Sequence, residues 1–395
     1  MVLGPLLRVG VLGRRVAVAG RAPPKGYRRV DFDSHDGGKG RNISEGTRGP
    51  TVRELGEFAL IDRITARRPD GPDVLLGPGD DAAVVGAPDG RVVITTDMLV
   101  EGRHFRRDWS APGEIGRKAI AQNAADVVAM GARPTGFVVA LGCPGDTLVA
   151  DVEDLFDGMW AEIARSGGAI VGGDVVGGER LVVSVTAFGD LGGRAPVTRA
   201  GARPGDLVAV AGGLGWSAAG LEILSRTDFP GARVTALAQN ADVVVPGADP
   251  AAVGRALATH RVPRPPYAAV REQLDHGVTP TALTDVSDGL LADLGHLARA
   301  SGTRIDVRAA ALAEPGLHAL AAALDVDAAQ WILAGGEDHA FAATFPADTA
   351  LPQDWRVIGD VHAGAGVTVD GGGYTGNTGW ESFRGVEVPP PGESR

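Results

Sequence analysis

Short apolar runs with the composition of β-strands alternate with helical patterns through most of the 395-residue chain. The β-type runs include AAVVG, RVVITTDMLVEG, TGFVVALG and LVVSVTAFGDL, and an alanine-rich helical pattern, PGEIGRKAIAQNAADVVAMGA, separates two of them. This mixing predicts an α/β or α+β fold, in which helices cover sheets. The chain length favours about two domains. The hydrophobic content of 44% is sufficient for a core in each.

Composition divides the chain into parts. Its first 50 residues hold ten Lys or Arg against four Asp or Glu and lack periodicity, which is typical of disorder. A helical pattern follows from Thr51, and Glu54 is placed to complete a capping box with it. The predicted parts are a disordered basic extension (1–50), an N-terminal domain (51–198), a C-terminal α/β domain (199–385) with a surface insertion (226–252), and a frayed tail (386–395).

Charge and cysteine content exclude several classes of protein. The net charge is −11, and the chain after the basic first 50 residues is more acidic still, which argues against nonspecific nucleic-acid binding. No apolar run approaches the roughly 18 residues of a membrane span, and we expect no signal peptide. A single cysteine, Cys143, fits a reducing compartment, so we expect the protein in the cytoplasm.

Carboxylates recur where apolar runs end or on helices that pack. The positions are Asp81 in GPGDDAAVV, Asp97 in ITTDMLVEG, Asp126 in IAQNAADVV, Asp174 in IVGGDVVGG, and Asp285 and Asp288 in DVSDGLL. Each alone has an ordinary explanation, such as a turn, a solvated helix face or, for Ser287 or Asp288, a helix cap. Together they favour a shared site, because buried carboxylates need a cation or hydrogen bonds to offset their cost.

Magnesium is the cation that this pattern favours. Oxygen donors are its preferred ligands, and Thr95 and Thr96 stand beside Asp97. Eight histidines and one cysteine give little support to a zinc site. Magnesium would accompany a nucleotide phosphate, although the sequence holds neither a P-loop nor a dinucleotide fingerprint.

Phosphate binding also needs positive side chains and close backbone approach. Glycines in VGGDVVGG allow backbone amides to approach a phosphate. The only lysines are Lys25, Lys39 and Lys118, so an arginine must act on the phosphates. Arg199, in VTRAGARPGD, is the candidate, and an ordinary surface arginine is the alternative.

These segments resemble a known family. GPGDDAAVV, TTDMLVEGRHF, AIAQNAADVVAMGARPTGFVVALG, VGGDVVGG, VTRAGARPGD, DVSDGLLADLGH and GGEDHAF occur in the order and approximate spacing of the thiamine-monophosphate kinases. This family belongs to the superfamily of aminoimidazole ribonucleotide synthetase and selenophosphate synthetase. The resemblance covers about residues 51 to 385. It implies the two-domain synthetase-like fold. In that fold the N-terminal domain (51–198) binds ATP and metal and pairs its sheet in a homodimer, and each C-terminal domain covers a cleft.

The resemblance also implies an activity and its residues. ATP would phosphorylate thiamine phosphate directly, with several Mg²⁺ ions in the cleft, giving thiamine diphosphate in the last step of its biosynthesis. The implied metal ligands are Asp81, Thr95, Thr96, Asp97, Asp126, Asp174, Asp285 and Asp288. The implied ATP contacts are Gly173, Asp174, Arg199 and Ser287, and the implied contacts with thiamine phosphate are His104, Glu337 and Trp380. Catalysis is assigned to Asp126, Asp174, Arg199 and Asp288.

Two alternatives stay open, and the sequence departs from the family at three places. The alternatives are an ATP-dependent synthetase of the aminoimidazole ribonucleotide or selenophosphate type, and a nucleotide-binding regulator without turnover. A selenophosphate enzyme would need an N-terminal Cys or Sec, and the first 50 residues contain no cysteine. The departures are that N-terminal extension, the long segment 226–252, and His339 where the family commonly has Tyr.

Overall fold

The computed structural model of the chain describes residues 49–65, 71–77, 82–226 and 243–380. Four expectations therefore fall wholly or largely outside the described residues. They concern the basic extension, Asp81, most of the segment 226–252, and the C-terminal tail.

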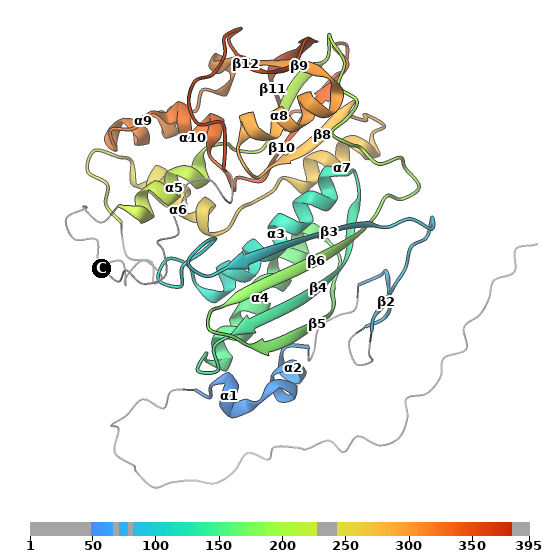
Figure 1. The fold of residues 1–395 in the computed structure, drawn as a ribbon, viewed down its shortest axis with the longest axis vertical. Coiled ribbons are helices and arrows are strands. Elements are labelled where there is room, and N and C mark those ends of the chain that lie inside the picture. The colour runs from blue at the N-terminus through green and yellow to red at the C-terminus, as the bar shows by residue number, and fades with distance from the viewer. Residues whose placement is uncertain (1–48, 66–70, 78–81, 227–242, 381–395) are drawn as a thin grey trace, which may run out of the picture. The chain divides into compact units, whose positions relative to one another are not determined.

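The earlier part of the described chain forms a four-stranded sheet that two long helices cover on one face (Figure 1). Its strand order is β3-β6-β4-β5, and only the β4–β5 pair is parallel among these neighbours. The strands are β3 (Val93–Val100), β4 (Arg133–Cys143), β5 (Ile170–Gly177) and β6 (Val182–Asp190), and the helices are α3 (Pro112–Ala129) and α4 (Val149–Ser166). A short two-stranded sheet comprises β1 (Val74–Leu76) and β2 (Val84–Val85).

The first helical segment is broken where a single helix was predicted. Thr51 and Glu54 form the expected capping box at the start of α1 (Val52–Leu55). Gly56 then adopts φ +83°, in the left-handed region that favours glycine, and α2 (Glu57–Thr65) begins after it. One glycine therefore divides the predicted helix into two.

Helices α3 and α4 approach each other closely because glycines lie at their contact. A Cβ on Gly116 would stand 1.8 Å from the Leu155 carbonyl oxygen, and one on Gly158 would stand 1.9 Å from that of Gly113. Side chains at these positions would force the helices apart. The contact fixes α3 against α4, and α3 carries Asn123 and Asp126.

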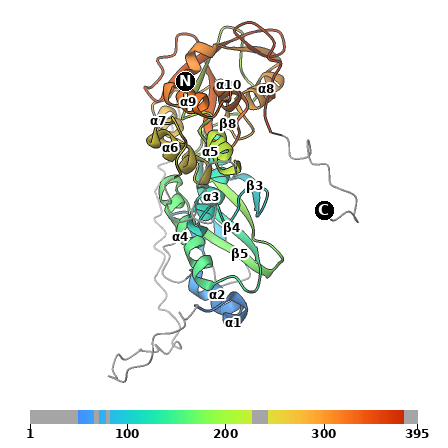
Figure 2. The ribbon, with the colours of Figure 1, turned by 90° about the vertical axis from the view of Figure 1, so that its left-hand side faces the viewer.

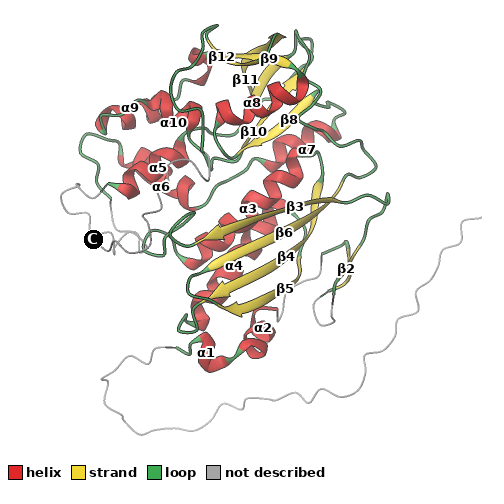
Figure 3. Ribbon diagram, in the orientation of Figure 1, coloured by secondary structure: helices red, strands yellow, loops and turns green. Residues whose placement is uncertain are grey.

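The later part of the chain builds a six-stranded sheet of order β12-β9-β11-β7-β10-β8, in which only the β12–β9 pair is parallel (Figure 3). Its strands are β7 (Leu207–Ala211), β8 (Ala282–Val286), β9 (Thr303–Val307), β10 (Ala340–Phe345), β11 (Trp355–Ala363) and β12 (Gly366–Val369). Its helices are α5 (Trp216–Ser225), α6 (Pro250–Arg261), α7 (Tyr267–Asp275), α8 (Leu290–Ser301), α9 (Pro315–Ala323) and α10 (Ala328–Ala334), with a 3-10 turn at Ala309–Leu312.

Two hydrophobic cores lie on the two faces of this six-stranded sheet. Along β10, Phe341 and Phe345 belong to the core that continues into the four-stranded sheet, whereas Ala340 and Ala342 belong to the core beneath α5, α8 and α10. This alternation follows from the two-residue period of a strand. The shared core joins the two sheets through α7 and α3 (Figure 2).

The fold confirms the predicted mixed α/β class. The two sheets use residues on either side of position 199, but the domain boundaries themselves stay predictions. Part of the segment predicted as an insertion is regular, because Asp249 caps α6, which begins at Pro250. No helix in the described part of the chain is long and apolar enough to cross a membrane.

Candidate active site

Polar contacts fix strand β3 against helix α3. The Thr95 hydroxyl donates to Asp126 Oδ2 at 2.7 Å, and the Asp97 backbone N–H donates to Asn123 Oδ1 at 3.1 Å. Asn123 is fully buried and its amide donates to the Ala119 carbonyl oxygen at 2.9 Å. Odd-numbered positions of β3 thus face α3, which places Thr95 and Asp97 beside Asp126.

Strand β8 brings a further carboxylate from the other sheet. Asp285 is 2% exposed and shares its face of β8 with Leu283, which belongs to the core that includes α3. Its Oδ2 lies 3.3 Å from His339 Nδ1. Asp288 follows in the turn after β8 and is half-buried.

The electrostatics show that these carboxylates form one group. Burial, followed by the charges of Asp285 and Asp97, raises the pKa of Asp126 to about 7. Burial and the charges of Asp285 and Asp288 raise the pKa of Asp97, and burial and Asp285 raise that of Asp288. His339 favours ionisation of all three. Burial alone would lower the pKa of His339, but its hydrogen bond to Asp285 and the charges of Asp285, Glu337 and Asp126 together outweigh burial and raise it.

A divalent cation fits this donor set. These four carboxylates come from β3, α3, β8 and the turn after β8. Burial first, and their mutual repulsion second, raise the pKa values of three of them, Asp97, Asp126 and Asp288. Hard oxygen donors that converge in this way suit Mg²⁺, whose charge would favour their ionised forms. The residues that could hold the metal are Asp97, Asp126, Asp285 and Asp288, with the Thr95 hydroxyl beside Asp126.

The turn that carries Ser287 and Asp288 is fixed by a residue that sequence reasoning missed. Asp293, which is 1% exposed, accepts hydrogen bonds at Oδ2 from the backbone N–H groups of Ser287, Asp288 and Gly289, each at 3.1 Å. The expected helix cap by Ser287 or Asp288 is not formed, since α8 begins after Gly289 without a side-chain cap. An acidic residue in the first turn of the helix was the available signal.

Asp293 also meets a geometric criterion for metal binding. One possible ligand atom from each of Asp288, Asp293 and His296 lies within 4.8 Å of the others. Asp293 Oδ2 already accepts three backbone hydrogen bonds, however. We therefore interpret Asp293 as a brace for the turn rather than as a ligand.

The residues assigned to thiamine phosphate lie around a second turn, which includes Glu337. Glu337 and His339 have φ values of +64° and +51°, which are uncommon for residues with side chains. Their N–H groups donate to the carbonyl oxygens of Ser287 at 2.7 Å and Val286 at 2.9 Å. The Trp380 N–H donates to the Asp288 carbonyl oxygen at 2.9 Å. Backbone hydrogen bonds therefore connect the turn that carries Ser287 and Asp288 to the turn that includes Glu337.

His104 lies in the segment that follows β3. Its Nδ1 accepts a hydrogen bond from the Val100 N–H at 3.0 Å, so its Nε2 carries the proton in the neutral ring. Burial lowers the pKa of His104 below its ordinary value. The Arg103 guanidinium carbon lies 5.3 Å from the centre of the Trp380 ring, which brings Trp380 to the segment that carries His104.

Two predicted metal ligands lie on the other face of the four-stranded sheet. Thr96 is exposed, and its hydroxyl donates to the Val185 carbonyl oxygen at 3.0 Å. Asp174 is exposed on β5, in the cross-strand row of Met98, Ser184 and Ala140. The structure brings Thr95, Asp97, Asp126, Asp285 and Asp288 together, but it does not bring Thr96 and Asp174 to them within this chain. Their metal roles stay predictions.

The residues assigned to ATP lie at separate places. Arg199 is exposed, its Nε donates to the Thr284 hydroxyl at 3.2 Å, and its charge favours ionisation of Asp288. Ser287 is half-buried in the braced turn. Gly173 is paired with Val139, where an added Cβ would stand 2.0 Å from the Val139 carbonyl oxygen. A glycine is therefore needed at position 173 for packing, whatever it contributes to ATP binding.

We expect Gly173→Ala to lower the free energy of unfolding by about 1–3 kcal/mol, because backbone atoms of β4 must move to admit the methyl group. Gly172→Ala is the matched control, since no atom lies within 4 Å of a Cβ at that position. Its effect should remain within about 0.5 kcal/mol. Chemical denaturation of both variants measures the difference, and equal stabilities would contradict the packing requirement.

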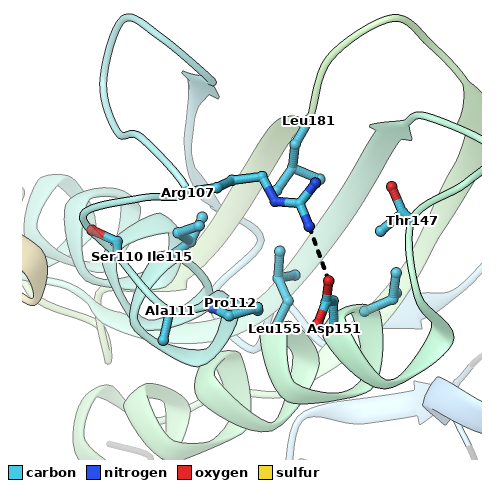
Figure 4. A pocket seen from close by; sticks show the side chains of 10 residues that line it. Arg107, Ser110, Ala111, Pro112, Ile115, Thr147, Asp151, Leu155 and Leu181 are labelled. Carbon is cyan, nitrogen blue, oxygen red and sulfur yellow. Dashed lines mark hydrogen bonds and ion pairs between the residues drawn. The ribbon is translucent and has the colours of Figure 1, made fainter. Parts of the chain in front are cut away.

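The described chain also holds cavities away from the carboxylate group. One, of about 280 Å³, lies between the start of α3, the start of α4 and Leu181 (Figure 4). Arg107 reaches across it to Asp151, with Nη2 2.9 Å from Oδ2. Asp126 lies near the other end of α3, roughly 20 Å along the helix. The cavity is therefore no part of the acidic site.

Comparisons with known proteins place the chain in a family. The family model described as AIR synthase related protein, N-terminal domain, matches residues 79–191. The thiamine-monophosphate kinase of Mycobacterium tuberculosis is 50% identical over 351 residues, which are 87% of this chain and 96% of that protein. The solved thiamine-monophosphate kinase of Stenotrophomonas maltophilia has a TM-score of 0.67 and 34% identity, covering 81% of this chain and 98% of that one.

A further solved structure contains ligands. AaThiL complexed with AMPPCP and TMP has a TM-score of 0.63 and 30% identity, and the match covers 87% of this chain and all of that one. The matches span both sheets of the fold and confirm the resemblance that the motifs indicated. The chain belongs to the thiamine-monophosphate kinase family.

Proposed function

We propose that the chain transfers the γ-phosphoryl group of ATP to thiamine phosphate and releases thiamine diphosphate and ADP. The observation that carries the proposal is the convergence of four carboxylates from both sheets beside the braced turn at Ser287. The relatives are named thiamine-monophosphate kinase, and a related structure holds AMPPCP and TMP. The alternative synthetase activity is not favoured by these relatives.

The chemistry requires no covalent enzyme intermediate. An oxygen of the acceptor phosphate forms a bond to the γ-phosphorus of ATP, and the bond from that phosphorus to the bridging oxygen of ADP breaks. The acceptor oxygen is already ionised, so the site needs no strong general base. Mg²⁺ bound at the carboxylates would neutralise the phosphates and permit their approach.

The chain's own residues supply binding and orientation. Asp293 fixes the turn that presents Ser287 and Asp288, and Thr95 and Asn123 fix β3 against α3. The Glu337 carboxylate can attract the cationic thiazolium ring or accept from the amino group of thiamine. Arg199, which is exposed near Asp288, is placed to act on ATP phosphates. The metal, ATP and substrate roles assigned from the sequence remain parts of this proposal.

We also propose that two copies pair through the open face of the four-stranded sheet. Ile94, Met98 and Val176 are exposed there by 58%, 52% and 53%, which is unusual for large apolar side chains. This face carries Thr96 and Asp174 as well. Sedimentation velocity should show a dimer at micromolar concentration, and a monomer would contradict the pairing.

We place the protein in the cytoplasm because its substrate ATP is found there and its single cysteine suits a reducing compartment. Recovery of the protein outside the cytoplasmic fraction would contradict this placement.

Acceptor specificity tests the function against its alternatives. Thiamine phosphate, free thiamine and an aminoimidazole-type substrate are each supplied with ATP and Mg²⁺. Of the three acceptors, we expect only thiamine phosphate to give ADP formation above background. Turnover of the aminoimidazole-type substrate would indicate a synthetase, and ATP binding without a single turnover of any acceptor would indicate a regulator.

A further inference from the structure

Lys118 is a buried lysine on α3 to which the sequence patterns assign no role. Its side chain is 3% exposed. Nζ donates to Glu337 Oε2 at 3.0 Å, to the His104 carbonyl oxygen at 3.1 Å and to the His260 carbonyl oxygen at 3.4 Å. A lysine ammonium has three donors, so these acceptors use all of its capacity.

These three acceptors come from separate parts of the fold. His104 follows β3, His260 lies near the end of α6, and Glu337 lies in the turn before β10. Lys118 and Glu337 are 219 residues apart in sequence. The lysine thus connects the β3 side of the site with the turn that is tied to Ser287.

The Glu337 carboxylate is held on one side and open on the other. Oε2 accepts from Lys118 and lies 3.7 Å from His260 Nδ1. About one-third of the Glu337 side chain, 33%, remains exposed. Burial opposes ionisation of Glu337, but the charge and hydrogen bond of Lys118 together with the charges of His260 and His339 outweigh burial and hold the pKa of Glu337 below its ordinary value. The second oxygen therefore belongs to an ionised carboxylate of fixed orientation.

We propose that Lys118 is a positioning residue for the acceptor substrate, because it fixes the Glu337 carboxylate and the His104 backbone toward one region. The inference rests on the proposed function, in which Glu337 and His104 contact thiamine phosphate. It adds a residue that contacts neither substrate nor metal and acts through Glu337 and His104. A purely structural lysine would stabilise the fold without affecting the affinity for one substrate.

The test uses Lys118→Met, which keeps the length of the stem and removes the charge. We expect KM for thiamine phosphate to rise by about 10- to 100-fold, as for the loss of hydrogen bonds to a charged group. KM for ATP should change by less than about threefold, because the ATP contacts are separate. Lys118→Arg retains charge and donors and should recover part of the loss.

Arg117→Met is the matched control on the same helix. Arg117 pairs with the buried Glu162 at 3.0 Å, away from Glu337, so its loss is a structural defect alone. We expect this variant to lower thermal stability with KM for thiamine phosphate unchanged. The same pattern in Lys118→Met would overturn the inference.

A double-mutant cycle with Glu337→Gln gives a readout at equilibrium. Binding of thiamine phosphate is measured by calorimetry for each single variant and for the double variant, and we expect strongly non-additive losses. Additive losses would overturn the inference. If Lys118→Met does not fold, Lys118→Arg replaces it in the cycle, and an unchanged affinity in Glu337→Gln would also overturn it. Wild-type protein without turnover of thiamine phosphate would instead refute the proposed function.

Discussion

Asp126→Asn should reduce magnesium-dependent turnover by about 100-fold or more, since loss of groups that support a metal site typically costs 10- to 100-fold and Asp126 is itself a proposed ligand. The substitution keeps the acceptor for the Thr95 hydroxyl, so β3 and α3 should stay in contact. It also removes the negative charge of Asp126, which the nearby carboxylates of Asp97 and Asp285 repel. Activity is measured across a magnesium titration.

The same variant should be more stable than wild type when metal is absent. The carboxylates repel one another in the metal-free protein, and burial already raises the pKa of Asp126 to about 7. A neutral amide relieves that repulsion, in the manner of active-site substitutions that exchange function for stability. Thermal denaturation in a chelator should show a higher midpoint for Asp126→Asn, and added magnesium should raise that midpoint less than in wild type.

Asp89→Asn is the control for these measurements. Asp89 pairs with Arg91 in a surface turn, and such pairs contribute little to stability. Turnover and the magnesium response should match wild type. Full turnover in Asp126→Asn at ordinary magnesium concentration would contradict the metal role of Asp126.

The metal-free protein should lose stability as the pH rises from about 6.5 to about 8. The folded-state pKa values of Asp126, Asp293 and Asp338 are all raised to about 7. Each carboxyl group binds its proton more tightly in the folded state, so its contribution is present at low pH and is lost as the pH rises through about 7. His339, whose pKa is raised above its ordinary value, contributes with the same sign.

Other groups act in the opposite direction, but at lower pH. Burial lowers the pKa of His260 to about 4, so its contribution grows as the pH rises toward the ordinary histidine value near 6.5. The lowered pKa of Glu337 likewise contributes at pH values above its ordinary range. Above about pH 6.5, the change in stability with pH therefore comes from the groups with raised pKa values.

Magnesium should reverse this pH trend. Metal binding requires ionised carboxylates, so magnesium should stabilise the protein more at about pH 8 than at about pH 6.5. Thermal denaturation with chelator and with magnesium at both pH values gives the comparison. A metal-free stability that stays constant or rises over this window, or a magnesium effect equal at both ends, would contradict the carboxylate cluster.

The sequence predicts the acidic group better than it predicts what holds the group. Asp97, Asp126, Asp285 and Asp288 stand out because carboxylates at the ends of apolar segments need an explanation. The structure brings these four together. Thr96 shares a motif with Asp97, and Asp174 lies in a separate glycine-rich motif, yet both lie on the opposite face of the sheet. For Thr96 the two-residue strand period already implies a face different from that of Thr95 and Asp97.

The supporting residues are harder to find because their partners are backbone atoms or lie far away in sequence. Asp293 accepts hydrogen bonds from three backbone N–H groups, and backbone groups leave no pattern in the sequence. Asp338 similarly accepts from the N–H groups of Gly215 and Ser217 at the start of α5. Lys118 meets Glu337 only after two sheets have packed together. Such contacts are products of tertiary structure, which local patterns do not specify.

The most direct measurement is the formation of thiamine diphosphate from ATP and thiamine phosphate in the presence of Mg²⁺. The purified protein is incubated with both substrates, and thiamine diphosphate and ADP are quantified in the same samples. We expect the two products in equal amounts, with formation abolished by a chelator or by omission of thiamine phosphate. ADP and inorganic phosphate without thiamine diphosphate would contradict the phosphoryl transfer that the site is proposed to perform.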